Sequence, residues 1–139
     1  MIPLKTPDEI EAIARAGAII GRLFNEIPER IRPGATTADL DAFVEEYIRS
    51  HPGAVPAFKG LYGFPASACI SVNHEVVHGI PSSKRVLEEG DIVSVDVGVL
   101  LDGWYADSAR TFPVGKIDAA AARLLEVTEK ALEAGIAEA

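Results

Sequence analysis

The sequence predicts an α+β domain with a mostly antiparallel sheet. Residues 7–27 and 37–48 carry apolar side chains at the spacing of amphipathic helices. Residues 91–100 and 104–112 have the pattern of two strands joined by a tight turn. Residues 118–138 are rich in alanine and return to a helical pattern. Two helices, a β region and a further helix in this order are typical of the α+β class.

Length and composition indicate an ordinary globular protein. The chain has 139 residues, of which 48% are hydrophobic and 24% are charged, so intrinsic disorder is excluded. The formal net charge is −8, from 21 acidic and 13 basic residues. An acidic surface repels phosphate backbones, so we expect no nucleic-acid partner, and solubility is the simpler explanation of the bulk charge.

The single cysteine and the N-terminus limit where the protein can work. Cys69 has no second cysteine with which to form an internal disulfide or a thiolate metal cluster. The first residues lack the pattern of a signal peptide, and no apolar run approaches the ~20 residues of a membrane helix. We therefore expect a cytoplasmic protein with no membrane partner.

The two N-terminal helices have recognisable start signals. Thr6 is the expected N-cap of the first helix, with Pro7 at its first position and Glu9 completing a capping box. Thr36 or Thr37 is the expected cap of the second. The first predicted apolar face comprises Ile10, Ile13, Ala14, Gly17, Ile20 and Phe24, and the second comprises Leu40, Phe43, Val44, Tyr47 and Ile48.

Residues 102–103 form the clearest turn in the sequence. The Asp-Gly pair between two strand-like runs is a strong signal for a two-residue hairpin turn. Such a turn pairs Leu101 with Trp104, which sets the register of the whole hairpin. The alternating valines of the first strand share one face, which we expect to be buried under the helices.

The same register brings two aspartates to the opposite face. Gly98 is expected opposite Asp107, and Asp96 opposite Ala109, so the two carboxylates are diagonal neighbours at roughly 7–8 Å between backbones. Gly98 has no side chain and leaves room between them. Aspartate is disfavoured in the middle of a strand, so the pair needs an explanation.

Three explanations of the Asp96–Asp107 pair remain open from the spacing. A divalent metal ion can lie between the carboxylates, or the pair can share a proton. Alternatively, both side chains lie on the solvated face of an edge hairpin or pair with lysine and arginine. A cysteine hydrolase is disfavoured because no base accompanies Cys69 in the nearby sequence.

Three linked motifs resemble those of type I methionine aminopeptidases. They are residues 71–81 (SVNHEVVHGIP), 90–98 (GDIVSVDVG) and 102–112 (DGWYADSARTF), in the order and spacing of that family. The resemblance covers essentially the whole chain. It implies one half of a pita-bread (creatinase/aminopeptidase) fold, with an antiparallel sheet covered by helices on one face. It also implies kinship with exopeptidases that remove the N-terminal methionine of peptides.

The resemblance also implies roles for particular residues. Asp96 and Asp107 match the first two metal-binding carboxylates, with Asp107 bridging two ions and Asp96 holding one. His78 matches a catalytic histidine that contacts substrate near the metals; without the motif, a hydrogen-bonded turn histidine would be the simpler interpretation. The complete site takes two divalent ions, and its carboxylates suit manganese, iron(II) or cobalt better than a structural zinc, although zinc is not excluded.

Three further residues match the pocket that receives the methionine side chain. Phe58, Phe64 and Cys69 would supply the apolar and polarisable surface that suits a thioether, although ordinary core packing is the alternative. His74 is interpreted as a solvated turn residue, and His51 as a histidine at a helix end.

The chain departs from the family in one respect. The remaining metal ligands, a histidine and two glutamates, belong to a C-terminal half, and the chain has no histidine after Asp107. We expect residues 1–139 to be a single domain, one pita-bread repeat plus the first helix of the next. Activity of the chain alone is then expected to be weak or absent.

Two interpretations of this half-fold follow. In the first, it is a truncated, designed or reconstructed half of a metalloaminopeptidase that pairs with a missing C-terminal half or with itself. A homodimer would bring Asp96, Asp107 and His78 of each chain to the same interface. In the alternative, the chain is a non-catalytic pita-bread module with a structural or binding role.

Overall fold

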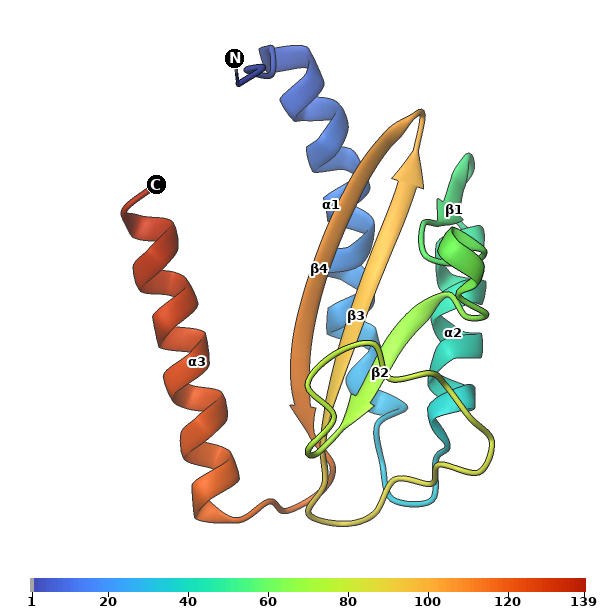
Figure 1. Cartoon of the computed structure of the whole chain (residues 1–139), viewed down its shortest axis with the longest axis vertical. Coiled ribbons are helices and arrows are strands. Elements are labelled where there is room, and N and C mark those ends of the chain that lie inside the picture. The colour runs from blue at the N-terminus through green and yellow to red at the C-terminus, as the bar shows by residue number, and fades with distance from the viewer. Residues whose placement is uncertain (1) are drawn as a thin grey trace.

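The computed structural model describes residues 2–139 as a small sheet flanked by helices (Figure 1). Its elements, in chain order, are α1 (Pro7–Glu26), the 3₁₀ turn η1 (Ile27–Glu29), α2 (Thr37–Arg49), β1 (Ala54–Pro56), the 3₁₀ turn η2 (Leu61–Gly63), β2 (Ala68–Val72), β3 (Ile92–Leu101), β4 (Trp104–Pro113) and α3 (Ala119–Ala137).

β3 is the central strand of an antiparallel sheet. All ten of its residues pair with β4 along one edge. The other edge is shared, because β2 pairs with residues 93–97 and β1 pairs with residues 99–101 (Figure 1). The sheet is therefore three strands wide, with the hairpin of β3 and β4 as its longest part.

Helices α1 and α2 cover one face of this sheet. Helix α1 packs on β3 and β4, and α2 packs on β1 and β2, so that both lie behind the sheet in Figure 1. The four alternating valines of β3 point into this layer and are 0% exposed, namely Val93, Val95, Val97 and Val99. The predicted fold class, an α+β structure with helices on one face of an antiparallel sheet, is confirmed.

The start of α1 agrees with the sequence, but its predicted apolar face is partly wrong. Thr6 caps the helix, and Thr6 and Glu9 exchange the two hydrogen bonds of a capping box. Ile10 is 56% exposed, whereas the buried residues are Ala12, Ala16, Ile19, Ile20 and Leu23. The reason is steric, since α1 approaches the sheet through small side chains: a Cβ on Gly17 would lie 3.8 Å from that of Ala106 on β4.

Helix α2 follows its predicted pattern. Thr36 is the N-cap and forms a capping box with Asp39. Thr37 is instead buried, and its hydroxyl exchanges two hydrogen bonds with the backbone of Ser82. The fully buried residues of the helix include Leu40, Val44 and Ile48, all within the predicted apolar face.

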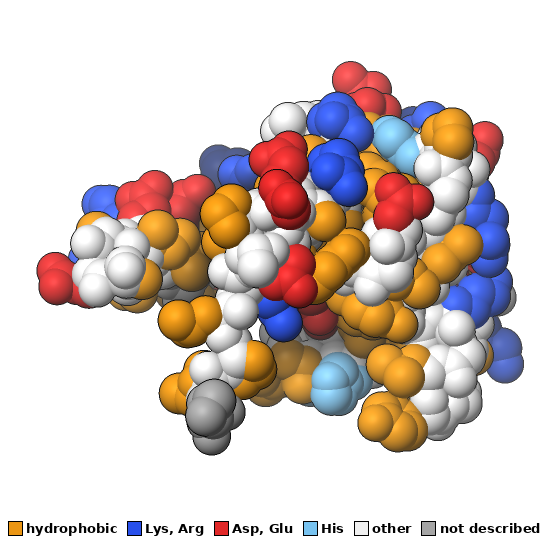
Figure 2. Space-filling model, turned by 90° about the horizontal axis from the view of Figure 1, so that it is seen from above, with side chains coloured by type: hydrophobic (Ala, Val, Ile, Leu, Met, Phe, Trp, Pro, Cys, Tyr) orange, Lys and Arg blue, Asp and Glu red, His pale blue; other side chains and the backbone are white. Residues whose placement is uncertain are grey.

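Helix α3 stands apart from the rest of the molecule (Figure 1). Asp118 caps its start, yet none of its residues is buried. An ion pair of 3.9 Å between Arg110 and Glu129 connects it to β4. Figure 2 shows it as a separate lobe with hydrophobic side chains at its surface. Its large exposed hydrophobic residues are 43–65% exposed, namely Leu124, Val127, Leu132 and Ile136. Within residues 2–139, no helix has the length and apolar character needed to cross a membrane.

Candidate metal centre

The hairpin of β3 and β4 sets the positions of the two predicted metal ligands. Leu101 pairs with Trp104 across a turn in which Asp102 and Gly103 have φ values of 51° and 84°, as a type I′ turn requires. In the resulting register Gly98 lies opposite Asp107, and Asp96 lies opposite Ala109. The predicted register is confirmed, and both aspartates occupy the sheet face that α1 and α2 leave open.

Strand β2 extends this open face on the other side of β3. Cys69 pairs with Asp96, and Ser71 pairs with Ser94. The Ser94 hydroxyl shares a hydrogen bond of 2.8 Å with the hydroxyl of Thr111 on β4. The open face therefore carries short polar side chains around Asp96, in contrast to the valine face behind it.

Asp96 occupies an unfavourable electrostatic position. Its Oδ1 atom is buried and has no hydrogen-bond partner. Burial, followed by the nearby charge of Asp107, raises the pKa of Asp96 to about 6, while His78 acts in the opposite direction. A buried carboxylate oxygen with no donor costs free energy, which a proton or a cation would recover. The interpretation of two solvated edge carboxylates is therefore disfavoured for Asp96.

His78 lies close enough to Asp96 to affect its ionisation, although the two residues come from different segments. It belongs to the loop that follows β2, and its backbone has a φ of 60°, in the left-handed region. His78 and Asp96 both line a hollow of about 790 Å³ between the open face and α3. Leu125, Thr128 and Leu132 form part of the α3 side of this hollow.

The structure places two of the three predicted pocket residues next to the carboxylates. A Cβ on Gly98 would lie 2.5 Å from Cε1 of Phe58, so the missing side chain makes room for this ring. Cys69 lies beside Asp96 and is 6% exposed. Phe64 is half-buried beyond η2 and forms no ring pair with Phe58 in the part of the chain that is described.

The Cys69 thiol is poorly suited to nucleophilic chemistry. Burial, together with the charges of Asp96, Asp107 and Asp41, raises its pKa to about 11. The thiol therefore stays protonated at neutral pH, and the thiolate is the nucleophilic form of cysteine. Its neutral, polarisable side chain fits the wall of an apolar pocket better.

The carboxylates fit a cation but do not form a complete metal site. The buried Oδ1 of Asp96 and the adjacent carboxylate of Asp107 are the hard oxygen donors that divalent ions prefer. Among residues 2–139, no three His, Cys, Asp or Glu side chains are arranged to hold a metal ion. His51 is engaged at the end of α2, with Nδ1 2.9 Å from the carbonyl oxygen of Tyr47.

Asp41 and Ser71, whose hydrogen bonds hold the segments that carry the site residues, were not identified from the sequence. Asp41 of α2 accepts hydrogen bonds of 2.8 Å from the N–H groups of Ser67 and Ala68, and so holds the start of β2. Ser71 binds the loop that carries His78. The alternation of side chains along β2 was the available signal, since it places Cys69 and Ser71 on the same face.

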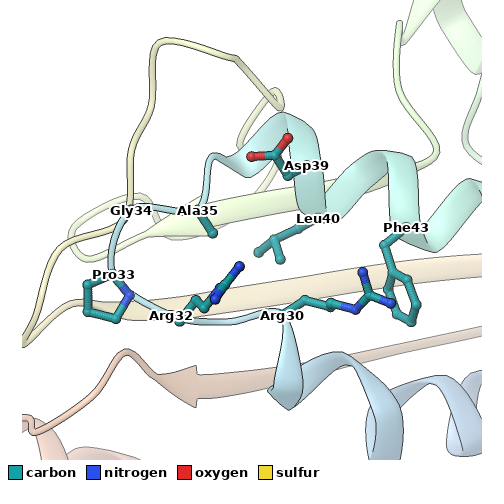
Figure 3. Close-up of a pocket in the computed structure, with 8 residues that line it drawn as sticks. All are labelled: Arg30, Arg32, Pro33, Gly34, Ala35, Asp39, Leu40 and Phe43. Atoms are coloured by element: carbon teal, nitrogen blue, oxygen red, sulfur yellow. The ribbon is translucent and has the colours of Figure 1, made fainter.

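A second cavity lies away from these residues (Figure 3). It has a volume of about 480 Å³ and is lined by the loop between η1 and α2 and by the start of α2. The guanidinium of Arg30 lies 4.9 Å from the ring centre of Phe43. The carboxylate of Asp39 accepts hydrogen bonds from the N–H and the hydroxyl of Thr36. None of the predicted site residues lines this cavity, so it is not part of the candidate metal centre.

Residues 11–139 match the sequence pattern of metallopeptidase family M24. The methionine aminopeptidase of Clostridium perfringens is 52% identical over 139 residues, which are 100% of this chain and 55% of that protein. Methionine aminopeptidase 1 of Bacillus subtilis is 48% identical over the same shares of both chains. The chain thus spans about half the length of these relatives, and it matches their N-terminal half.

Solved structures show the same relation. The methionine aminopeptidases of Rickettsia prowazekii and Thermotoga maritima both superpose with a TM-score of 0.91, at 39% and 44% identity. In each case the match covers 96% of this chain and 53% of the other. The prolidase of Pyrococcus furiosus superposes with a TM-score of 0.79 at 28% identity. The predicted half of a pita-bread fold and the resemblance to methionine aminopeptidases are confirmed.

Proposed function

Because the chain belongs to metallopeptidase family M24, we propose that it supplies the N-terminal half of an aminopeptidase site that removes methionine from peptides. One observation carries the proposal. The open face presents a buried carboxylate oxygen of Asp96, without a hydrogen-bond partner, beside the carboxylate of Asp107. A module with no metal to bind has no physical need for such a pair, because the two charges destabilise each other.

Asp96 and Asp107 would hold the divalent metal that the family implies. In this proposal the complete site takes two ions from among manganese, iron(II), cobalt and zinc, with Asp107 contributing to both and Asp96 to one. When bound, such ions act as Lewis acids toward the carbonyl of the scissile peptide bond. The Asp96 side chain would hold the ion in its ionised form, which the cation itself favours.

The other residues of the open face would bind and orient the substrate. His78, on the rim of the hollow that also contains Asp96, would hydrogen-bond the substrate near its scissile bond. Phe58, Phe64 and Cys69 would surround the methionine side chain. The protonated thiol and the aromatic rings are polarisable and apolar, as a thioether requires.

One copy of the described residues supplies only Asp96 and Asp107 as donors, so the remaining ligands must come from a further chain segment or from a second copy. The relatives are about twice as long as this chain, so a C-terminal half is the first candidate. A second copy of the chain is the other candidate. Across a twofold axis it would add its own Asp96, Asp107 and His78 to the same cavity, and metal would offset the repulsion of four carboxylates.

A non-catalytic binding module is the alternative function, and the incomplete donor set is the observation that favours it. In that case the open face would bind no metal ion, and replacing Asp96 or Asp107 would not change the affinity of the chain for divalent ions. Metal binding at Asp96 and Asp107 therefore distinguishes the two functions.

Catalytic competence can be tested by joining the chain to the C-terminal half of a relative. The chain is joined to the C-terminal half of the Clostridium perfringens relative, and release of methionine from a Met-Ala peptide is measured with manganese. We expect manganese-dependent release, and a loss of at least about 100-fold on Asp96→Asn or Asp107→Asn. Asp102→Asn is the matched control, because this exposed turn aspartate lies outside the site.

Two results would reject the catalytic proposal. One is a folded, joined protein that releases no methionine with any of the four metals. The other is full activity in the Asp96→Asn protein, which would separate the reaction from the candidate metal centre.

A further inference from the structure

We infer that Ser71 is a positioning residue that holds His78 at the edge of the candidate metal centre. The inference rests on the proposed role of His78 and adds a residue for which the resemblance implied no role. Ser71 does not act on the substrate in this account. It acts through the backbone of Gly79, the residue that follows His78.

Two hydrogen bonds attach Gly79 to β2. Its N–H donates to the Ser71 hydroxyl at 3.0 Å, in a buried position, and its carbonyl accepts from the N–H of Ile70 at 2.9 Å. β2 pairs with β3 through its other edge, so Gly79 occupies the free edge. Ser71 is 3% exposed, and a buried hydroxyl of this kind needs a partner.

The contact is too close for any residue other than glycine. A Cβ at position 79 would lie 2.2 Å from the carbonyl oxygen of Ile70 and 2.8 Å from the Cα of Ser71. Both atoms belong to the backbone of β2 and cannot move aside cheaply. The loop is therefore held directly against β2. This contact determines the position of His78, the residue that precedes Gly79.

The backbone of His78 is strained. Its φ of 60° lies in the left-handed region, which is unfavourable for a residue with a Cβ. A strained conformation persists only when neighbouring contacts impose it, and the bonds of Gly79 to Ser71 and Ile70 are the adjacent contacts. They turn the chain so that His78 lines the same hollow as Asp96 and Ser71.

Amide hydrogen exchange on the isolated chain tests the placement. In the Ser71→Ala protein the Gly79 N–H loses its acceptor, and we expect its exchange to be at least about fivefold faster. Ser94→Ala is the matched control, because it removes a hydroxyl from the neighbouring strand that bonds Thr111 instead of Gly79. An unchanged exchange rate at Gly79 in the Ser71→Ala protein would overturn the inference.

A double-mutant cycle in the joined protein tests whether Ser71 acts through His78. We expect Ser71→Ala to lower kcat about tenfold with little change in KM, since the proposed methionine pocket is not altered. In a His78→Ala background the same change should have almost no further effect, because the residue that Ser71 positions is absent. The Ser50→Ala protein, which loses a hydroxyl that donates to the backbone of Tyr47 at the end of α2, should keep the kcat of the parent.

The outcomes separate the inference from the proposed function. Equal effects of Ser71→Ala with and without His78 would overturn the inference, since Ser71 would then act on overall stability alone. Full kcat in the His78→Ala protein would instead reject the proposed role of His78, and the exchange rate of Gly79 would still decide whether Ser71 places this residue.

Discussion

Asp96 and Gly98 are two residues of β3 that suit the candidate metal centre better than they suit the stability of the strand. Asp96 lies in the middle of β3, a position where β structure disfavours aspartate, and its Oδ1 is buried without a partner. Gly98, two residues later, has no side chain where a strand usually packs one. Both choices weaken the strand. The first supplies a carboxylate to the open face, and the second makes room for the Phe58 ring.

We expect Asp96→Asn to stabilise the metal-free chain at neutral pH. The pKa of Asp96 is raised to about 6, so the folded chain binds its proton more tightly than the unfolded chain does. This group therefore destabilises the fold progressively as pH rises from about 4 through 6, and the loss is complete above that range. Because the carboxyl is partly solvated, the expected gain at pH 7.5 is about 1 kcal/mol.

Thermal unfolding at pH 4 and pH 7.5, without metal, measures this effect. The Asp96→Asn protein should unfold at a higher temperature than the parent at pH 7.5 and show little difference at pH 4. The Asp102→Asn protein should match the parent at both values. A lower unfolding temperature for Asp96→Asn at pH 7.5 would contradict the account of this carboxylate.

We expect Gly98→Ala to destabilise the chain by about 1–3 kcal/mol. The added Cβ would lie 2.5 Å from the Phe58 ring and 3.0 Å from the Cβ of Ala57, so the segment after β1 must move. Gly21→Ala is the control, because a Cβ there meets no atom within 4 Å and alanine is favoured inside a helix. Urea denaturation should separate the two, and equal stability of both proteins would show that Phe58 is not held against β3.

At the scale of elements, the hairpin could be predicted and the loops could not. A two-residue Asp-Gly turn determines one register, so the positions of Asp96 and Asp107 followed from local chemistry. The placement of His78 depends on the contact of Gly79 with β2, which no local pattern encodes. The buried face of α1 was mispredicted in part because small residues at the contact, such as Ala12 and Ala16, give a weak hydrophobic signal.

Helix α2, which packs on the sheet, and helix α3, which has no buried residue, should respond differently when a leucine is replaced by alanine. Leu40 of α2 is 0% exposed, and Leu40→Ala should cost about 2–5 kcal/mol. Leu132 of α3 is 63% exposed, and Leu132→Ala should change the stability of the monomer by less than about 0.5 kcal/mol. Chemical denaturation measures both, and a large loss for Leu132→Ala in a monomeric sample would mean that α3 is packed in solution.

At the scale of the whole molecule, the open face and α3 are the two parts that make few contacts within the described residues of one chain. The chain spans about half of its relatives, its two carboxylates are an incomplete donor set, and α3 has no buried residue. The carboxylate pair and the half-fold could be inferred from the sequence, because both are carried by residues of this chain. The partner that completes the site could not, because one copy of these residues does not show whether a C-terminal half or a second copy supplies the remaining ligands.

If a second copy completes the site, manganese should drive dimerisation. Sedimentation equilibrium should then give a monomer mass without metal and a dimer mass with it, since the ions offset the repulsion between the aspartates of the two copies. Asp107→Asn should abolish the metal-dependent increase, and Asp102→Asn should not. A monomer at all manganese concentrations would reject the homodimer and leave a C-terminal half as the completing partner.

The most direct test of the central claim is a titration of the isolated chain with Mn²⁺, followed by the EPR signal of the free ion. The account predicts weak binding, with a Kd of about 0.1–1 mM, that is lost in both Asp96→Asn and Asp107→Asn and retained in Asp102→Asn. Equal binding by all four proteins, or none by any of them, would contradict the claim that these two carboxylates form half of a metal site.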